Sequence, residues 1–503
     1  MNSLCSGIKA FFSFCTVHKK LVLFRLCIFL GQRTWFVPDE YFQSVEVAYS
    51  EVFGKGTKTW EWEPDKALRS YLHPLFYMVP FYVLKLLNLD TAWAFQFTVG
   101  LIHFILTLVA DVAITQCYRR ILSNKKSQDT ALILYQMNWF ILYCTPRTLA
   151  NTIEMLLGVY AAALYPKVAF IPLVLLAGLI RPTSAIVWAP LVLQVLFKGG
   201  FKFIGKFILI SIVLAAITIS VDYSFYGKLT IPVINFFLFN IYTGGSSKFG
   251  VNSIFYYLGG LVSLAPVESV LLVLLILFNL KMVSSHLKWM WKKERMVITY
   301  CLLSLLYILI HSAIPHKEHR FLLPIIPFIV PLVASLYSKI CPKTSIFKFA
   351  MVNIPFILIF GLIHQCAHQN VMREVGHKVE RHENGKISYL TPCYSLPHYA
   401  WLHPNGLKWN ISQLDCISNI DGDEDKSPQD LFFENPITAI TNDWDKYVGD
   451  AKIIVMYDKL INEIAESGLK DRFERAYNNI SFFHTFWPVG ENSGQYLIVF
   501  TRK

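Results

Sequence analysis

The stretch "LLSLLYILIHSAIPHKEHRFLLPIIPFIVPLVAS", residues 302–335, sets two apolar runs on either side of the polar sequence "HKEHRF" at 316–321. Each apolar run belongs to a segment long enough to cross the roughly 30 Å of hydrocarbon in a bilayer. Five consecutive ionisable side chains beside such segments would be costly inside the membrane. The stretch therefore predicts two spanning helices joined by a polar loop at the membrane surface.

The whole chain has the composition of a polytopic membrane protein. Its 503 residues are 54% hydrophobic and only 16% charged, which excludes a water-soluble globule with one ordinary core. Apolar stretches recur through residue 366, whereas residues 367–503 are rich in Asp, Asn and charged turns. We predict an all-α membrane bundle over residues 1–366 and a small soluble domain over 367–503.

Basic clusters give the expected topology. The net charge of +12 comes mainly from short loops between apolar segments, so it marks the cytosolic side and does not point to nucleic acid. An arrangement of about eleven spans satisfies every cluster and places the N-terminus in the cytosol, with the first loop (33–91) and the C-terminal domain in the lumen. The expected spans are 20–32, 92–118, 128–145, 149–165, 168–180, 185–198, 203–221, 253–280, 296–314, 321–338 and 349–366.

One apolar stretch, residues 73–89, is expected to lie flat on the luminal surface. If it crossed the membrane, the basic cluster after Arg119 would face the wrong side. Pro74, Pro80 and Lys85 interrupt the stretch, and a helix in the interface tolerates such residues better than a helix at the membrane centre. A re-entrant segment or a true span is the alternative.

The tail, residues 367–503, carries signs of an oxidising lumen. Glycosylation sequons begin at Asn410 and Asn479, and Cys393 with Cys416 could form a disulfide, although their separation in space cannot be read from the sequence. "KIIVMY", "DKLINEIAESG" and "GQYLIVFTR" indicate a strand, a helix and a later strand. A small α/β or α+β domain is the expected fold.

Charged residues that are unusual beside spans fall together on the predicted luminal side. Loops above a helical bundle can assemble one site there, and its position at the membrane favours a lipid-linked substrate. The segments are "PDEY" at 38–41, "TWEWEPDKALRSYLHP" at 59–74, "RTLANTIE" at 147–154, "RPT" at 181–183 and "HKEHR" at 316–320.

Asp39 and Glu40 directly follow the first predicted span. Either carboxylate could accept the proton of an attacking hydroxyl group, while a phosphate leaving group needs no general acid. On the sequence alone, the more ordinary interpretation is that Asp39 caps a helix expected over 40–53.

The loop at 316–320 is suited to phosphate. His316, Lys317, His319 and Arg320 are donors for phosphate oxygens, and Glu318 could orient them. The plain alternative is a charge run that anchors two spans at the headgroups, but two histidines among five polar residues exceed what anchoring needs. The spacing does not match a standard zinc pattern, so no metal site is predicted.

Four other luminal side chains have two interpretations each. Arg147 and Arg181 could add positive charge to a phosphate pocket, or they could bind helix carbonyls or pair with Glu154. Trp60 and Trp62 could stack on sugar rings, or they could belong to the aromatic belt of the interface.

The combination of "HKEHRF", "WFVPDEYFQSVEVAY", "TWEW", "LRSYLHP" and "RTLAN" resembles the GT-C mannosyltransferases of the endoplasmic reticulum that use dolichyl phosphate mannose. The resemblance covers the whole membrane part. In the tail, "TPCYSLPHYAWLHP" at 391–404 and "FFHTFWPVGENSGQYLIVFTRK" at 482–503 resemble the branch that adds the third mannose to glycosylphosphatidylinositol (GPI) anchors.

The resemblance implies transfer of mannose in α1,2 linkage from dolichyl phosphate mannose to the second mannose of a GPI precursor lipid, with inversion, at the endoplasmic reticulum membrane. No cofactor, nucleotide sugar or metal is implied, and protein partners are unknown. We expect catalysis from Asp39 or Glu40, with Asp39 preferred. We expect donor phosphate binding at residues 316–320 with Arg147 and Arg181, and acceptor binding at Trp60, Trp62 and Arg69.

Other functions stay open at this point. Within the family, the alternatives are α1,2 or α1,6 mannosyltransferases of N-linked glycan assembly and the enzyme that adds the fourth GPI mannose. A lipid-phosphate transporter or scramblase would also need cationic phosphate contacts, but it should show paired halves, and the sequence has no evident internal symmetry. A structural subunit is a third class, in which Asp39→Asn should leave activity intact.

Overall fold

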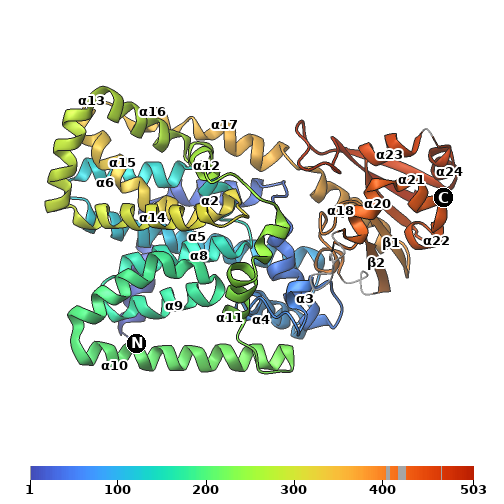
Figure 1. Cartoon of the computed structure of the whole chain (residues 1–503), viewed down its shortest axis with the longest axis horizontal. Coiled ribbons are helices and arrows are strands. Elements are labelled where there is room, and N and C mark those ends of the chain that lie inside the picture. Colours follow the sequence, from blue (N-terminus) through green and yellow to red (C-terminus); the bar gives the residue numbers. More distant parts are fainter. Residues whose placement is uncertain (1, 404–407, 417–425, 466) are drawn as a thin grey trace. The chain divides into compact units, whose positions relative to one another are not determined.

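The computed structural model describes residues 2–403, 408–416, 426–465 and 467–503. The described chain is mostly helical and has one small sheet near its C-terminus (Figure 1). It divides into two compact units. Unit 1 comprises residues 1–30, 61–73 and 100–357, and unit 2 comprises residues 31–60, 74–99 and 358–503. The sequence predicts a different division, into a membrane domain over residues 1–366 and a luminal domain over 367–503. That division concerns the side of the membrane, which the two compact units do not test, so it stays a prediction.

Unit 1 is a bundle of apolar helices connected by short loops. Its helices, including three that extend into unit 2 at one end, are α1 (Asn2–Val17), α2 (Lys19–Gly31), α5 (Ala92–Ile121), α6 (Lys125–Met137), α7 (Trp139–Cys144), α8 (Ala150–Leu164), α9 (Ile171–Ile180), α10 (Ala185–Tyr226), α11 (Pro232–Phe237), α12 (Tyr256–Leu264), α13 (Pro266–Lys293), α14 (Arg295–Ala313), α15 (Ile326–Ile340), α16 (Ile346–Ala350) and α17 (Asn353–Leu358). Its shorter turns are η3 (Val168–Phe170), η4 (Pro182–Ser184), η5 (Leu238–Tyr242), η6 (Gly245–Phe249) and η7 (His319–Ile325).

Several of these helices are long and apolar enough to cross a membrane, so the chain is a multi-pass membrane protein. Among the described residues there are six such stretches: Ala92–Ile121, Pro182–Tyr226, Pro266–Lys293, Arg295–Ala313, His319–Ile340 and Ile346–Glu380. Shorter apolar helices lie at Leu72–Leu86, Ala150–Leu164, Val168–Ile180 and Pro232–Tyr242. The polytopic α-helical class is confirmed, while the count of eleven spans stays a prediction.

The longest helix, α10, is broken at a glycine pair. Gly200 has φ 66° and ψ −170°, a conformation that is open to glycine and strained for other residues. The break separates the two segments that the sequence analysis assigned to different spans, 185–198 and 203–221. The basic residues Lys198 and Lys202 flank it.

The helix α4 (Leu72–Leu86) covers most of the stretch expected to lie flat. Its 15 residues extend only about 23 Å, less than the roughly 30 Å of a bilayer core. One face is buried through Tyr77 and Phe81, whereas Val79, Val83 and Leu86 on the other face are exposed and apolar. An exposed apolar face of this kind suits contact with the membrane surface. The flat orientation remains a prediction.

Unit 2 contains a mixed sheet of five strands in the order β2-β1-β3-β5-β4. β1 pairs in parallel with β2 and β3, and β5 pairs antiparallel with β3 and β4. The strands are β1 (Gly385–Leu390), β2 (Trp409–Gln413), β3 (Ile453–Tyr457), β4 (Tyr477–Phe483) and β5 (Tyr496–Arg502). The helices and turns are η1 (Tyr41–Val45), α3 (Glu46–Phe53), α4, η8 (Ile359–Ile363), α18 (Ala367–Glu380), α19 (Tyr399–Leu402), α20 (Pro428–Glu434), α21 (Pro436–Asn442), α22 (Trp444–Tyr447), α23 (Asp458–Ala465) and α24 (Leu469–Ala476), with η2 (Trp60–Trp62) at the junction of the units.

The central strand β3 explains why this domain folds around its sheet. Alternate residues of β3 enter two different cores, with Val455 packing toward α18 and Met456 toward α20 to α24. A strand buried on both faces needs a continuous apolar run, which "IIVMY" supplies. The strand, helix and strand predicted from the sequence correspond to β3, α23 and β5, so the small C-terminal α/β domain is confirmed.

Candidate functional site

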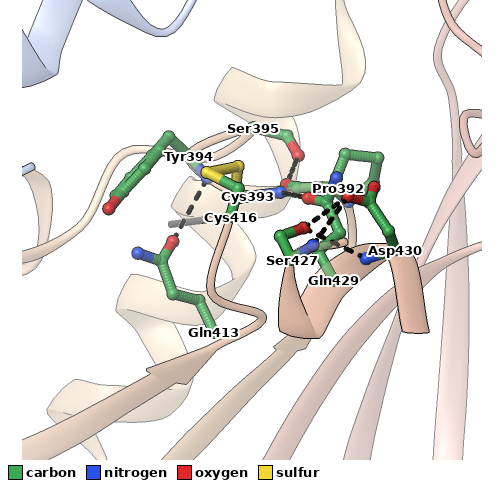
Figure 2. Close-up of a disulfide and its surroundings, with 9 residues drawn as sticks. All are labelled: Pro392, Cys393, Tyr394, Ser395, Gln413, Cys416, Ser427, Gln429 and Asp430. Carbon is green, nitrogen blue, oxygen red and sulfur yellow. Dashed lines mark hydrogen bonds between the residues drawn. A yellow bond between two sulfur atoms is a disulfide. The ribbon is translucent and has the colours of Figure 1, made fainter. Parts of the chain in front are cut away.

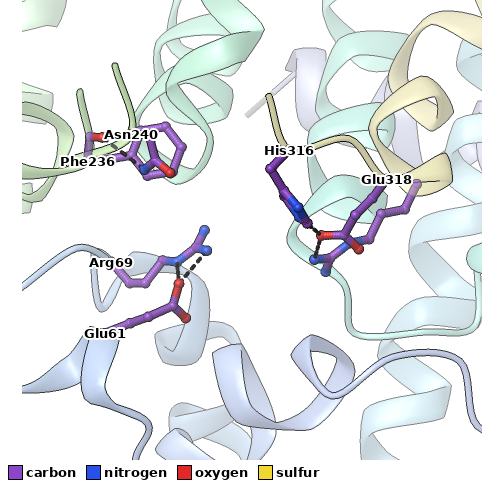
Figure 3. Close-up of polar contacts among 7 residues, drawn as sticks. Glu61, Arg69, Phe236, Asn240, His316 and Glu318 are labelled. Atoms are coloured by element: carbon purple, nitrogen blue, oxygen red, sulfur yellow. Dashed lines mark hydrogen bonds and ion pairs between the residues drawn. The ribbon is translucent and has the colours of Figure 1, made fainter. Parts of the chain in front are cut away.

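A compact ion cluster lies in the loop after α14 and the first two residues of η7, and we call residues 316–320 the cationic loop. Glu318 is its centre. Arg320 donates from Nε to Oε2 at 2.7 Å and from Nη2 to Oε1 at 2.5 Å, and His316 Nε2 lies 3.2 Å from Oε1 (Figure 3). The guanidinium therefore binds the carboxylate through two bonds, a geometry in which arginine also binds phosphate.

The electrostatics of the cationic loop keep its carboxylate ionised. Burial raises the pKa of Glu318, but the positive charge of Arg320 and the hydrogen bonds from His316 and Arg320 outweigh burial and hold that pKa below its usual value. Glu318 is therefore an anionic partner for Arg320 at neutral pH. A phosphate group carries the same kind of charge and could exchange with it.

Lys317 and His319 point to other partners. The Lys317 ammonium donates to the backbone carbonyls of Ile314 at 2.7 Å and Asn252 at 3.0 Å, and the side-chain amide of Asn252 donates back to the Lys317 carbonyl at 3.2 Å. His319 Nδ1 lies 2.8 Å from the hydroxyl of Tyr256. Lys317 thus fastens the loop to residue 252, and a direct role in phosphate binding stays a prediction for both side chains.

Three arginine–glutamate pairs gather in unit 1. Arg69 Nη2 lies 2.7 Å from Glu61, Arg181 Nε lies 3.2 Å from Glu154, and Arg320 pairs with Glu318. Arg181 is close enough to Arg69 and Arg320 for their charges to repel one another. Figure 3 shows the Glu61–Arg69 pair in the same view as His316 and Glu318. The structure therefore brings together three of the predicted cationic residues from three separate loops.

The backbone that carries Arg69 is held by the end of α10. Asp222 accepts hydrogen bonds from the Tyr71 amide at 2.8 Å and the Ser70 hydroxyl at 3.1 Å, and Tyr226 donates to the Arg69 carbonyl at 2.7 Å. Asp222 and Tyr226 lie four residues apart, on one face of the helix. They fix the position of the Arg69 loop within unit 1.

Arg147 lies at the end of α7 and is buried. Its Nε donates to the Tyr143 carbonyl at 3.1 Å, and its guanidinium stacks over the Tyr143 ring at 4.1 Å from the ring centre. The alternative role weighed for Arg147, bonding to a helix carbonyl, is therefore present, while Glu154 pairs with Arg181. Donor binding by Arg147 stays a prediction.

Asp39 and Glu40 belong to unit 2 and open a continuous helical segment. Both are partly exposed, and the next residues, Tyr41–Val45, form a π-helical turn that leads into α3. Turns of this kind are rare and occur often at functional sites. The helix start therefore presents two carboxylates at an irregular and partly accessible position, which suits a general base.

Glu46 anchors that helical segment to other parts of unit 2. Its buried carboxylate accepts hydrogen bonds from the backbone amides of Tyr399 at 2.8 Å, Ala400 at 3.1 Å and Thr57 at 3.4 Å. Burial raises the pKa of Glu46 to about 7, although the backbone hydrogen bonds act in the opposite direction. α3 is thereby tied to the segment before β2 within the same unit.

Trp60 and Trp62 are both buried, with 8% and 3% of their surface exposed. The Trp62 ring packs edge-on against Tyr71 at 4.9 Å. Burial leaves little of either ring open to headgroups or to a sugar, so the structure favours neither interpretation. Their proposed stacking on an acceptor sugar stays a prediction, as does the role of Arg69 in acceptor binding.

The tail, residues 367–503, contains the disulfide that the sequence left open. Cys393 and Cys416 are bonded, with their Cα atoms 5.9 Å apart (Figure 2). Gln413 and Gln429 accept hydrogen bonds from the backbone amides of Tyr394 and Cys393, so the bridge sits in a fixed loop. This pairing suits an oxidising compartment.

Both predicted glycosylation sites lie on the edges of the sheet. Asn410 is exposed on β2 and Asn479 is exposed on β4, the two outer strands. Exposed asparagines at these positions are compatible with glycan attachment, and occupancy stays a prediction. Within the described residues, no three His, Cys, Asp or Glu side chains are grouped to hold a metal ion.

Sequence reasoning missed several supporting residues. Asp222 and Glu46 were not singled out, nor was the buried pair formed by Arg25 and Asp111, in which Arg25 donates from Nη2 at 2.7 Å and from Nε at 2.9 Å. Asp222, Arg25 and Asp111 are each a lone charge in an apolar run. That signal could have found them, because such charges almost always have a partner.

Comparisons with known proteins identify the family of the chain. Residues 16–403 match the sequence model of the Alg9-like mannosyltransferase family. A protein of Mus musculus named GPI alpha-1,2-mannosyltransferase 3 is 28% identical over 96% of this chain and 89% of its own length. A protein of Drosophila melanogaster named GPI mannosyltransferase 3 is 29% identical over 83% of this chain and 75% of its own length.

The fold also has a solved counterpart. The crystal structure of ArnT from Cupriavidus metallidurans bound to undecaprenyl phosphate matches with a TM-score of 0.53, covering 97% of this chain and 98% of that one at 11% identity. At that identity the similarity concerns the fold. It supports the GT-C architecture expected from the sequence.

Proposed function

Because this chain belongs to the Alg9-like mannosyltransferase family and is a glycosyltransferase, we propose that it adds the third mannose of the GPI anchor. In this reaction mannose passes in α1,2 linkage from dolichyl phosphate mannose to the second mannose of the precursor lipid. The names of the relatives support the linkage and the pathway. The polyprenyl phosphate held by ArnT supports a polyprenyl-phosphate donor.

The observation that carries the proposal is the cluster of Arg69, Arg181 and Arg320. Each of the three guanidinium groups has a carboxylate partner in unit 1, and Arg181 is within reach of the charges of Arg69 and Arg320. Arginine forks stabilise negative charge as it develops on a leaving phosphate. Arg320 is the strongest candidate for that contact because its bidentate partner, Glu318, occupies the kind of position that a phosphate would take.

The proposed reaction is a single displacement with inversion. The acceptor hydroxyl oxygen forms a bond to the anomeric carbon of the donor mannose as the bond from that carbon to the phosphate oxygen breaks. The hydroxyl proton passes to Asp39, or to Glu40, and the bonding electron pair leaves on dolichyl phosphate. No cofactor or metal is invoked.

The proposed setting is the endoplasmic reticulum membrane, with eleven spans, a cytosolic N-terminus, and the first loop and residues 367–503 in the lumen. The exposed sequons at Asn410 and Asn479 and the bonded pair Cys393–Cys416 support a luminal tail. A scan with engineered sequons tests the flat helix. Glycosylation of a sequon placed near Asp90 supports it, and failure of that site while Asn410 or Asn479 is modified contradicts it.

The direct test is a transfer assay. Membranes that contain wild type, Asp39→Asn or Arg320→Ala are incubated with radiolabelled dolichyl phosphate mannose and a GPI precursor bearing two mannoses. A third, α1,2-linked mannose made by wild type alone supports the reaction and both residues. Extension of an N-linked glycan precursor in its place would retain the family and reject the GPI acceptor. Use of neither acceptor would favour a lipid transporter.

A further inference from the structure

The loop between β4 and β5 exposes a short apolar segment. Phe486, Trp487 and Val489 are 59%, 62% and 59% exposed, although they belong to a domain whose cores are otherwise well buried. Three large apolar side chains within four residues form a surface that water does not favour. We call Phe486–Val489 the apolar tip.

The apolar tip is held in place. Thr485 is fully buried, and its hydroxyl lies 2.8 Å from His364 Nδ1 and 3.1 Å from the Trp487 backbone amide. His484 donates from its backbone amide to the Gln495 carbonyl at 2.7 Å, which closes the base of the loop. The exposure of the tip therefore belongs to an ordered loop.

The anchoring residues place the tip beside the end of an apolar helix. His364 directly follows η8 (Ile359–Ile363), and the Cys366 backbone amide donates to the His484 carbonyl at 3.2 Å. Gln365, between them, has φ 61° and ends the apolar segment before α18 begins. All of these residues belong to unit 2, and Figure 1 shows dark-red loop segments beside the orange chain that follows α17.

The end of that helix is itself exposed and apolar. Leu358, Leu362 and Ile363 are exposed, and the stretch from Ile346 onward is apolar enough to cross a membrane. A spanning helix that stops at Ile363 enters the headgroup region there, and tryptophan is the residue most suited to that region. A tip beside that end would lie at the depth where its rings gain most from contact with lipid.

We infer that the apolar tip inserts into the membrane interface and fastens the C-terminal domain to the bilayer surface. The occupant is the lipid headgroup and upper acyl region on the side where the last span ends. The contact is additional to mannosyl transfer. It holds the β4–β5 loop at the membrane surface through three inserted side chains and the hydrogen bond between Thr485 and His364.

The test is photocrosslinking in the full-length protein. Trp487 is replaced by the photoreactive residue benzoylphenylalanine, and the protein is reconstituted in phosphatidylcholine vesicles containing phosphatidylcholine with an alkyne at the acyl end. The matched control carries the same residue in place of Leu431, which is exposed on α20 in the same domain. We expect several-fold more lipid adduct at position 487 than at position 431.

Equal yields of lipid adduct at the two positions would overturn the inference, and so would an adduct at position 487 to protein alone. Retained mannosyl transfer by both variants confirms that they are folded. If the variant at position 487 does not fold, replacement of Val489 repeats the test from the other end of the tip. Lipid adducts there again support membrane contact, and their absence contradicts it.

Discussion

Glu318 in unit 1 and Glu46 in unit 2 are carboxylates stabilised by opposite means. Burial raises the pKa of Glu318, but the positive charge of Arg320 and the hydrogen bonds from His316 and Arg320 hold that pKa below the usual value. Glu46 is held by three backbone amides, and burial raises its pKa to about 7. A charged partner can be exchanged for another ion, whereas a backbone amide has a fixed place in the fold. The cationic loop is therefore suited to binding an anion in place of Glu318, whereas the Glu46 contacts stabilise the helix that begins at Asp39.

The largest expected effect concerns the helix that Glu46 supports. Asp39→Asn should lower kcat by about 10²–10⁴ with little change in KM, because a positioned general base contributes that much to a proton transfer. The measurement is initial-rate transfer kinetics at matched protein levels. Glu40→Gln is the control and should retain most activity. If the two variants exchange these outcomes, Glu40 is the base, and full activity in both would remove the carboxylates from the chemistry.

The next effect concerns the exchangeable partner in the cationic loop. Arg320→Ala should lower kcat by about 10²–10³, the order of the loss when one charge-stabilising donor is removed from an active site. Arg320→Lys should recover only part, because lysine keeps the charge but not the two-bond geometry. Lys426→Ala removes an exposed cation of unit 2 and serves as the control. Wild-type rates in Arg320→Ala would show that Glu318 and Arg320 are only structural.

A smaller effect should appear in the pH dependence of stability. Because the pKa of Glu46 is raised in the folded protein, its protonated form is favoured there, and stability should fall as pH rises from about 4.5 to about 7. The change is at most roughly 3 kcal/mol for such a shift. Glu46→Gln has no proton to lose, so the difference in Tm between wild type and variant should change across this window.

Thermal unfolding in detergent, followed at several pH values, measures that difference. A constant difference from pH 4.5 to 7 would mean that Glu46 does not titrate there. If Glu46→Gln shows no unfolding transition at any pH, both carboxylate oxygens are needed to accept the hydrogen bonds of the three backbone amides. In that case Glu46→Asp, which retains the charge on a shorter side chain, tests the same titration.

The smallest effect should come from the edge of the cationic loop. Tyr256→Phe removes the hydroxyl that lies 2.8 Å from His319 Nδ1 and leaves the ring in its tilted contact with the imidazole. One neutral hydrogen bond at an exposed position contributes about 1 kcal/mol, so KM for the donor should rise only a few-fold. Donor titrations at saturating acceptor measure it. A loss as large as that of Arg320→Ala would assign His319 a direct role in binding.

Much of the fold could be predicted from the sequence because long apolar runs indicate membrane-spanning helices. The break at Gly200 falls between two predicted spans, 185–198 and 203–221, and the β3–α23–β5 order was visible through a change of apolar period. The three cationic segments around Arg69, Arg181 and Arg320 were each conspicuous as charges beside apolar sequence. Asp222 could have been found as a lone charge in an apolar run, whereas Glu46 carries no such signal. For neither carboxylate does anything local in the sequence show which backbone amides it will meet.

The sequence by itself determined the class of membrane protein, the C-terminal α/β domain and the charged residues that stand out beside apolar segments. These features depend on composition and on the local spacing of apolar residues. The tertiary structure alone decided the partners: Arg320 with Glu318, Arg181 with Glu154, and Cys393 with Cys416. It also decided that Trp60 and Trp62 are buried while Trp487 is exposed. Partners and exposure depend on contacts between residues far apart in the chain, and those contacts exist only once the helices and the sheet have packed.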